Sequence, residues 1–235
     1  GSTWSNTKPT ITNVSQSPIT IYVQVLGDEN HNTKASGSKT VTISKKQISL
    51  GTHSATYNGT KSYSRTFETG VGSENLVLTY APYAKTAASY TYATSAGSGK
   101  YTVTMANGTG LANNYTITGG GTFTINKKAL TISAYETDWV SGATTYTRNS
   151  YATNTNNETI TLTYTPNANT VGTYTYATTT GSGKYLLSLS DSTNYSINSA
   201  GDLTLTAIDA TCPTITDYSA QYDGSAHGIG VTGGS

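Results

Sequence analysis

The feature that most constrains this chain is a long segment that occurs twice. Residues 78–101 read LTYAPYAKTAASYTYATSAGSGKY, and residues 162–185 read LTYTPNANTVGTYTYATTTGSGKY, an offset of 84 (162 − 78). Composition alone does not produce a match of this length. A repeat of this kind indicates a modular fold in which one structural unit follows another.

Shorter matches flank the long one. The pair Lys45-Lys46 returns as Lys127-Lys128 at an offset of 82 (127 − 45), and Asn114-Tyr115 returns as Asn194-Tyr195 at an offset of 80 (194 − 114). Offsets that drift by a few residues are what insertions and deletions in loops produce. The matches predict two complete modules, at 45–126 and 127–208.

Each copy has the alternation of polar and apolar residues that β-strands show. The chain contains 19 Tyr but only 2 Phe and 2 Trp, and Tyr and Thr both favour strands. The alternating stretches lie at residues 76–80, 101–105, 115–118, 122–125 and 130–133. We therefore predict an all-β chain of tandem Ig-like β-sandwich modules in an elongated rod. The alternative is a β-grasp-like module with little helix.

The junction between the modules lacks a flexible linker. Residues 123–133 run from the last predicted strand of one copy into the first of the next, without a Gly, Ser or Pro stretch. A connection this short leaves little freedom between domains, which is why a stiff rod is expected.

Charge and cysteine content exclude several classes of function. Charged residues make up 11% of the chain and the formal net charge is +1, so no basic face for nucleic acid is expected. No apolar run reaches the length of a membrane span, so this fragment is not expected to insert into a membrane. A lone cysteine, Cys212, fits an extracellular protein that does not rely on disulfides. Gly1-Ser2 resembles a vector scar, and we interpret the chain as a piece of a longer secreted protein.

Residues near both ends and in the centre resemble known bacterial surface repeats. The segment from Tyr222-Asp223-Gly224 to Ile229 is similar to the opening of MBG-type repeats, and residues 1–44 resemble the closing part of one. The two central copies resemble YDG-type modules. By this resemblance, residues 209–235 open a further MBG-type repeat. The resemblance implies secretion, cell-wall attachment or display on the cell surface, and a role as a stalk or adhesin.

The Tyr-Asp-Gly motif varies among the copies in a way that indicates a structural role. The first copy has Tyr57-Asn58-Gly59, and the second has Trp139 to Gly142 at that place. A position that accepts Asn in place of Asp does not require a carboxylate. We expect Asn58 and Asp223 to close turns ahead of Gly59 and Gly224.

No set of residues predicts catalysis, a cofactor or a metal. Gly97–Lys100 and Gly181–Lys184 have a fragment of a phosphate-loop pattern, but the first glycine, the final Ser or Thr and a following helix are missing, which favours a turn between strands. His31, His53 and His227 lack metal-ligand spacing. The chain is therefore not expected to be an enzyme.

Two lysines allow an internal crosslink as an alternative. Lys46 and Lys128 stand at predicted strand ends, with Glu74 and Glu158 as the carboxylates that an isopeptide bond to asparagine would need nearby. Lysines at such places are ordinarily solvated and protect a sheet edge.

Tyrosines repeated in both copies are candidates for glycan contact. Tyr90 and Tyr92 recur as Tyr174 and Tyr176, and residues two apart in a strand share a face. A Tyr ring can stack on a sugar, but equal placement in both copies also fits packing between strands, and packing is favoured.

Three functions follow from these observations. The favoured one is a structural stalk or spacer of a secreted bacterial surface adhesin. The second is direct adhesion to a host glycan or matrix protein. The third is self-association, in which the incomplete module at one end of a molecule is completed by the other end of the next, since open strand edges recruit strands. Neighbouring modules of the same protein are partners in all three.

Overall fold

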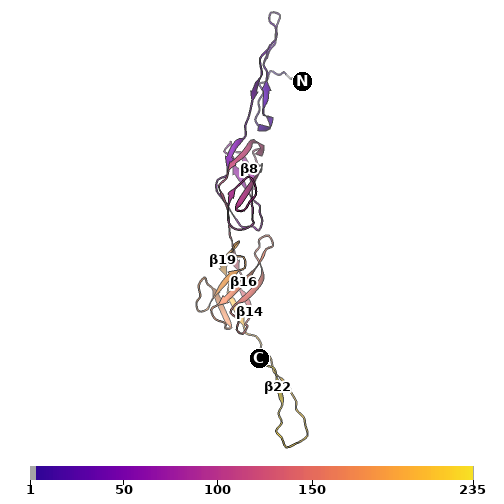
Figure 1. Ribbon diagram of the computed structural model, residues 1–235, viewed down its shortest axis with the longest axis vertical. Coiled ribbons are helices and arrows are strands. Elements are labelled where there is room, and N and C mark those ends of the chain that lie inside the picture. The colour runs from indigo at the N-terminus through magenta and orange to yellow at the C-terminus, as the bar shows by residue number, and fades with distance from the viewer. Residues whose placement is uncertain (1–3, 235) are drawn as a thin grey trace. The chain divides into compact units, whose positions relative to one another are not determined.

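The computed structural model describes residues 4–234 and divides into two units. The division falls between Lys128 and Ala129. Below, the first and second units mean the repeated module in each part, whose strands span residues 46–126 and 128–206. Nearly all regular structure is β, which confirms the all-β prediction (Figure 1). The described part of the chain adds only the short 3-10 helices η1 (Val14–Gln16) and η2 (Ala112–Asn114).

The first unit contains eight strands that follow the first sequence repeat. Six form one curled sheet in the order β6-β12-β9-β10-β8-β7, and β5 pairs with β11 beside it. The strands are β5 (Lys46–Ser49), β6 (His53–Thr56), β7 (Tyr63–Glu68), β8 (Asn75–Pro82), β9 (Ser89–Tyr92), β10 (Lys100–Asn107), β11 (Tyr115–Gly119) and β12 (Thr122–Asn126).

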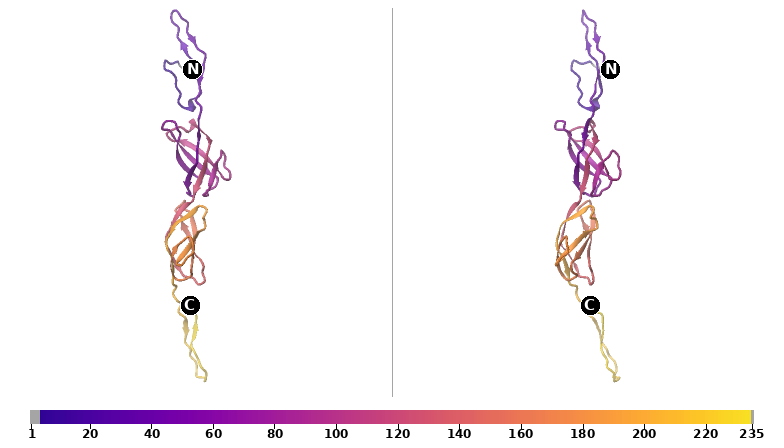
Figure 2. Two further views of the ribbon diagram at one scale, coloured as in Figure 1. Left: turned by 90° about the vertical axis from the view of Figure 1, so that its left-hand side faces the viewer. Right: turned by 60° about the vertical axis from the view of Figure 1, so that its left-hand side comes forward.

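The second unit repeats this arrangement strand for strand. Its six-stranded sheet has the order β14-β20-β17-β18-β16-β15, and β13 pairs with β19. The curl of each sheet is visible from two further sides in Figure 2. The strands are β13 (Lys128–Ile132), β14 (Tyr135–Asp138), β15 (Tyr146–Ala152), β16 (Thr159–Pro166), β17 (Gly172–Tyr176), β18 (Lys184–Leu189), β19 (Tyr195–Ala200) and β20 (Leu203–Thr206).

The opening and closing strands of each unit lie side by side in parallel. β6 pairs with β12 from His53–Phe123 to Thr56–Asn126, and β14 pairs with β20 in the same way. In the first unit, the chain bends at Gly51, between β5 and β6, and at Gly121, between β11 and β12. At this point the Gly121 N–H donates to the Gly51 carbonyl over 3.1 Å. After the bend, the parallel pairing of β5 with β11 is followed by that of β6 with β12. The first and last strands of the unit are thereby held together.

Tyrosine rings fill much of each core. In β8, every second side chain is buried, and Leu76, Leu78 and Tyr80 have no exposed surface. Phe123 of β12 contacts the rings of Tyr80 and Tyr101 at centroid distances of 5.0 and 5.7 Å. Burial of a Leu or Phe side chain such as these contributes about 1.5–3 kcal/mol.

The segments outside the repeats form small sheets without a core. The N-terminal strands pair as β1 with β4 and β2 with β3, and the C-terminal strands as β21 with β22. Among described residues, none in 4–45 or 207–234 is buried. The strands are β1 (Ile19–Ile21), β2 (Gln24–Val25), β3 (Lys34–Ala35), β4 (Lys39–Val41), β21 (Thr214–Thr216) and β22 (Gly230–Thr232).

Candidate contact sites

The first pair of candidate glycan-binding tyrosines is buried. Tyr90 is 3% exposed and Tyr174 is 5% exposed. The Tyr90 hydroxyl donates to the carbonyl of Thr86 over 2.8 Å, and the Tyr174 hydroxyl donates to that of Thr170 over the same distance. Neither ring has a face open to a sugar. Their equal placement reflects one packing role used in both units.

The second pair is half-buried and packs against core tyrosines. Tyr92 lies 5.8 Å from Tyr101, ring centroid to centroid, and Tyr176 lies 5.9 Å from Tyr185. Edge and tilted contacts at this separation are favourable for aromatic rings. These rings therefore contribute to the cores as well.

Asn58 closes a turn in the first unit. Its side-chain oxygen accepts from the Thr60 N–H over 2.9 Å, and its amide donates to the Ser62 carbonyl over 3.1 Å. Gly59 follows with a φ of 73°, a conformation that glycine adopts without steric cost. Gly142 of the second unit has the same φ of 73°.

Asp223 occupies a similar turn near the C-terminus. Its carboxylate accepts from the Ser225 N–H over 2.9 Å, and Gly224 has a φ of 82°. The Ser225 N–H, and then the His227 ring at 2.8 Å, hold the pKa of Asp223 below its usual value. His227 also stacks on Tyr218, with centroids 4.8 Å apart. The cluster is internally hydrogen-bonded, so its geometry is that of a turn.

The Gly-Ser-Gly-Lys segments are turns that lead into strands. The Lys100 N–H donates to the Gly97 carbonyl, and the Lys184 N–H donates to the Gly181 carbonyl, both over 3.0 Å. Strands β10 and β18 begin at these lysines. No helix dipole faces either turn, and the Lys100 ammonium is hydrogen-bonded to the Thr91 hydroxyl over 2.9 Å. The preference for turns is confirmed.

A buried polar cluster that the sequence analysis missed recurs in both units. The Tyr195 hydroxyl donates to a Glu158 carboxylate oxygen over 2.7 Å and lies 3.0 Å from the Thr153 hydroxyl. Tyr115 makes the corresponding bonds to Glu74 and Thr69. The signal in the sequence is a Thr with a Glu five residues later, which both copies contain (69 and 74, 153 and 158), although Thr131 and Glu136 have the same spacing outside the cluster.

The carboxylates in this cluster are hydrogen-bonded to tyrosines, and burial, followed by these bonds, raises the pKa values of the tyrosines. Burial first, and then the hydrogen bond to Glu74, raise the pKa of Tyr115; burial and Glu158 do the same for Tyr195. Lys46 is exposed, and its ammonium donates to the Gly70 carbonyl over 3.1 Å. An isopeptide bond needs its lysine buried beside the carboxylate, so this arrangement does not favour one at Lys46.

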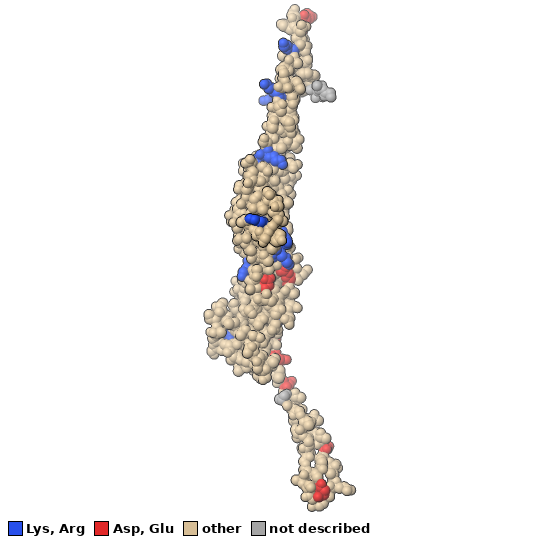
Figure 3. All heavy atoms as spheres, in the orientation of Figure 1, with Lys and Arg blue, Asp and Glu red and all other residues tan. Residues whose placement is uncertain are grey.

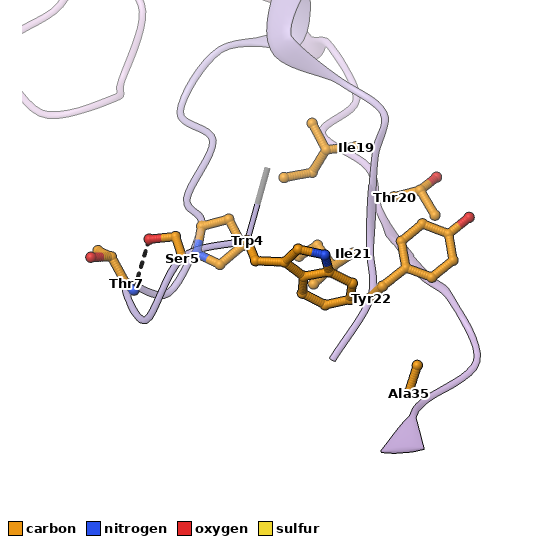
Figure 4. Close-up of a pocket in the computed structure, with 9 residues that line it drawn as sticks. Trp4, Ser5, Thr7, Ile19, Thr20, Ile21, Tyr22 and Ala35 are labelled. Carbon is orange, nitrogen blue, oxygen red and sulfur yellow. Dashed lines mark hydrogen bonds between the residues drawn. The ribbon is translucent and has the colours of Figure 1, made fainter. Parts of the chain in front are cut away.

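The N-terminal segment has an open apolar groove. Figure 4 shows the Trp4 ring beside Ile21 and Tyr22, with Ile19 on the same side of the groove. Trp4 is 57% exposed and Tyr22 is 60% exposed. The apolar lining comes from Trp4, Pro9, Ile11, Ile19, Ile21, Tyr22, Val23, Leu26, Val41 and Ile43.

Residues 4–234 contain no candidate metal site. No cluster there has three or more His, Cys, Asp or Glu side chains placed to hold a metal. Asp28 pairs with His31 at 2.7 Å in an exposed loop. The face shown in Figure 3 carries scattered charged side chains. No described helix has the length and hydrophobicity of a membrane span.

Comparison with known proteins gives no relative from which a site could be transferred. No protein-family model, no curated protein and no solved structure matches the chain.

Proposed function

We propose that the chain is a structural spacer: successive β-modules that hold other parts of a secreted bacterial surface protein away from the cell. The observation that carries this proposal is the strand-for-strand duplication of a unit with a filled core. A repeated unit without a recurrent set of reactive groups supplies length and mechanical strength.

The connection between the units supports a stiff arrangement. Strand β12 ends at Asn126 and β13 begins at Lys128, so a single residue, Lys127, separates the last strand of one sheet from the first strand of the next. So short a connection restricts independent motion of two domains. We therefore include an elongated rod in the proposal.

The parallel pairing bears on the module type. Ig-like sandwiches are built from antiparallel sheets. Each unit here pairs its opening strand in parallel with its closing strand, as β6 with β12 and β14 with β20. This pairing favours the β-grasp-like alternative for the module.

The surface location in this proposal rests on sequence. Resemblance to MBG-type and YDG-type repeats and the lone Cys212 support secretion and display at the cell surface or cell wall. Direct adhesion to glycan is not proposed, because Tyr90 and Tyr174 lack an open ring face.

Small-angle X-ray scattering tests the spacer. We expect the chain to have one well-defined maximum dimension, and a short Gly-Ser insertion after Lys127 to broaden the distance distribution. The same insertion after Ser182, in the turn before β18, is the matched control and should leave the distribution unchanged. A wild-type distribution already as broad as that of the junction insertion would contradict a stiff spacer.

A further inference from the structure

We propose that residues 213–224 of one copy of this chain pair, as a parallel strand, with residues 36–46 of a second copy. We name 213–224 the opening segment and 36–46 the closing segment. The proposal is independent of the spacer function, because a spacer works whether or not its ends associate.

The opening segment matches the opening strands of the first unit. Residues 48–59 read ISLGTHSATYNG and residues 213–224 read PTITDYSAQYDG, an offset of 165 (213 − 48). Ser219-Ala220 is equivalent to Ser54-Ala55, and Tyr222 is equivalent to Tyr57. The opening segment therefore resembles β6 and its turn in sequence.

The closing segment matches the closing strands of the first unit. Residues 36–46 read SGSKTVTISKK and residues 118–128 read TGGGTFTINKK, an offset of 82 (118 − 36). Val41 is equivalent to Phe123, and Ile43 is equivalent to Ile125. The chain thus carries the opening strand of one module near its C-terminus and the closing strand of another near its N-terminus.

Both complete units show how such segments pair. The Tyr57 N–H donates to the Asn126 carbonyl over 2.8 Å, and the Trp139 N–H donates to the Thr206 carbonyl over 2.9 Å. Applying the offsets places the Tyr222 N–H of one copy on the Ser44 carbonyl of the other. The register of β6 with β12 likewise places Tyr218 beside Val41.

The edges that this pairing needs are open in the described part of the chain. β4 pairs only with β1, and residues 217–223 belong to no strand. The Ile43 N–H donates to the Ser17 hydroxyl over 2.8 Å, as the equivalent Ile125 N–H donates to the Ala88 carbonyl over 2.9 Å. Because neighbouring residues of a strand direct their backbone groups to opposite sides, the N–H and carbonyl groups of Thr42 and Ser44 face the vacant edge.

Exposed apolar side chains near both segments also favour a second copy of this chain as the partner. The groove beside the closing segment contains Ile21, Val41 and Ile43. The opening segment brings Ile215, 61% exposed, and Tyr218, 50% exposed. Their equivalents, Leu50 and His53, pack in the first unit, where Leu50 is 3% exposed and the His53 ring lies 5.7 Å from Phe123. Each copy carries both segments, so the contact is head-to-tail and can continue along a chain of molecules.

A disulfide trap tests the register. Gln47 pairs with Thr116 in the first unit. Extended just before the two segments, the offsets convert this pair into Cys212 of one copy and Lys34 of the other. Cys212 is a free, exposed thiol, and Lys34 is exposed. We expect Lys34→Cys, under mild oxidation, to give a ladder of covalent dimers, trimers and longer species on non-reducing electrophoresis. The wild-type chain has one thiol, so oxidation can link at most two copies into a covalent dimer.

Lys39→Cys is the matched control, since Lys39 is an exposed lysine of β4. In the proposed register it lies opposite Thr216, four residues from Cys212, roughly 13 Å along a strand and beyond the reach of a disulfide. We expect about tenfold less ladder from this variant. Equal ladders from both variants, or a Lys34→Cys disulfide formed within one chain, would overturn the proposal.

A proline pair tests the backbone contact without oxidation. By the alternation of a parallel strand, the N–H of Ala220 points to the same side as that of Tyr222, whereas the N–H of Gln221 points away. Sedimentation velocity over a concentration series should show association of wild type and of Gln221→Pro, and its loss in Ala220→Pro. Wild type that sediments as a monomer at every concentration, or Ala220→Pro that associates like wild type, would contradict the pairing.

Discussion

At the scale of single residues, the tyrosine hydroxyls hold the bends and loops of each unit in place. Tyr101 donates to the Gly121 carbonyl over 2.8 Å at the bend before β12, and Tyr185 donates to the Gly201 carbonyl at the matching bend. A phenylalanine would fill the same space but remove this hydrogen bond from the part-buried carbonyls, which is costly. These two bonds explain a preference for tyrosine over phenylalanine at positions 101 and 185.

The Thr-Glu-Tyr cluster gives the first prediction. We expect Tyr195→Phe to lower the free energy of unfolding by about 1–3 kcal/mol, because Glu158 and Thr153 lose a buried partner. Chemical denaturation followed by circular dichroism measures the change. Tyr83→Phe, at a half-exposed position, is the control and should change stability by less than about 0.5 kcal/mol. Equal effects of the two substitutions would show that the cluster does not stabilise the unit.

Alkaline pH gives the second prediction. Burial, and then the neighbouring Tyr80 and Tyr92 hydroxyls, raise the pKa of Tyr101 to about 12, against about 10 in an unfolded chain. Since the folded state holds its proton longer, this contribution to stability is complete below about pH 10 and is lost as the pH rises towards 12. We expect denaturation midpoints to fall over this range, and less steeply in Tyr101→Phe. A flat profile between these pH values would contradict the assignment.

At the scale of elements, the glycine bend between β11 and β12 allows two parallel strand pairs to follow one another. A Cβ on Gly121 would lie 2.5 Å from the Gly51 backbone, whereas a Cβ on Gly119 would meet its nearest neighbour, the Ser49 hydroxyl, at 3.6 Å. The close approach of the two backbones therefore depends on Gly121.

This contrast gives the third prediction. Gly121→Ala should lower the free energy of unfolding by about 1–3 kcal/mol, because the Gly51 backbone must move. Gly119→Ala, two residues away, should have a clearly smaller effect. Thermal melts of the two variants and wild type make the comparison, and a larger loss for Gly119→Ala would show that the bend is not limited by this contact.

The strands were predictable where alternation was strong. Residues 76–80, 101–105 and 122–125 lie within β8, β10 and β12. The parallel pairing of opening and closing strands was not predictable, because alternation shows which face is buried but not which strand lies alongside. The same limit applies to Tyr90: its spacing fitted both an exposed platform and a core position, packing was favoured, and the fold shows that the ring is buried.

At the scale of the molecule, stability is concentrated in the two repeated units. Their cores hold all of the buried apolar side chains among the described residues, whereas the terminal segments have only small exposed sheets. The opening and closing strands of each unit pair with one another, so each unit should unfold as one cooperative element. A spacer built in this way resists extension until a unit opens as a whole.

Pulling the chain from its two ends in a single-molecule force experiment tests the spacer most directly. The strands of the units span residues 46–126 and 128–206, so we expect two abrupt events, each releasing about 80 residues or roughly 270 Å of extended chain. Phe123→Ala, which removes a side chain with no exposed surface, should lower the force of one event and leave the other unchanged. A single event for the whole chain, or smooth extension at low force, would contradict the account of two independent load-bearing modules.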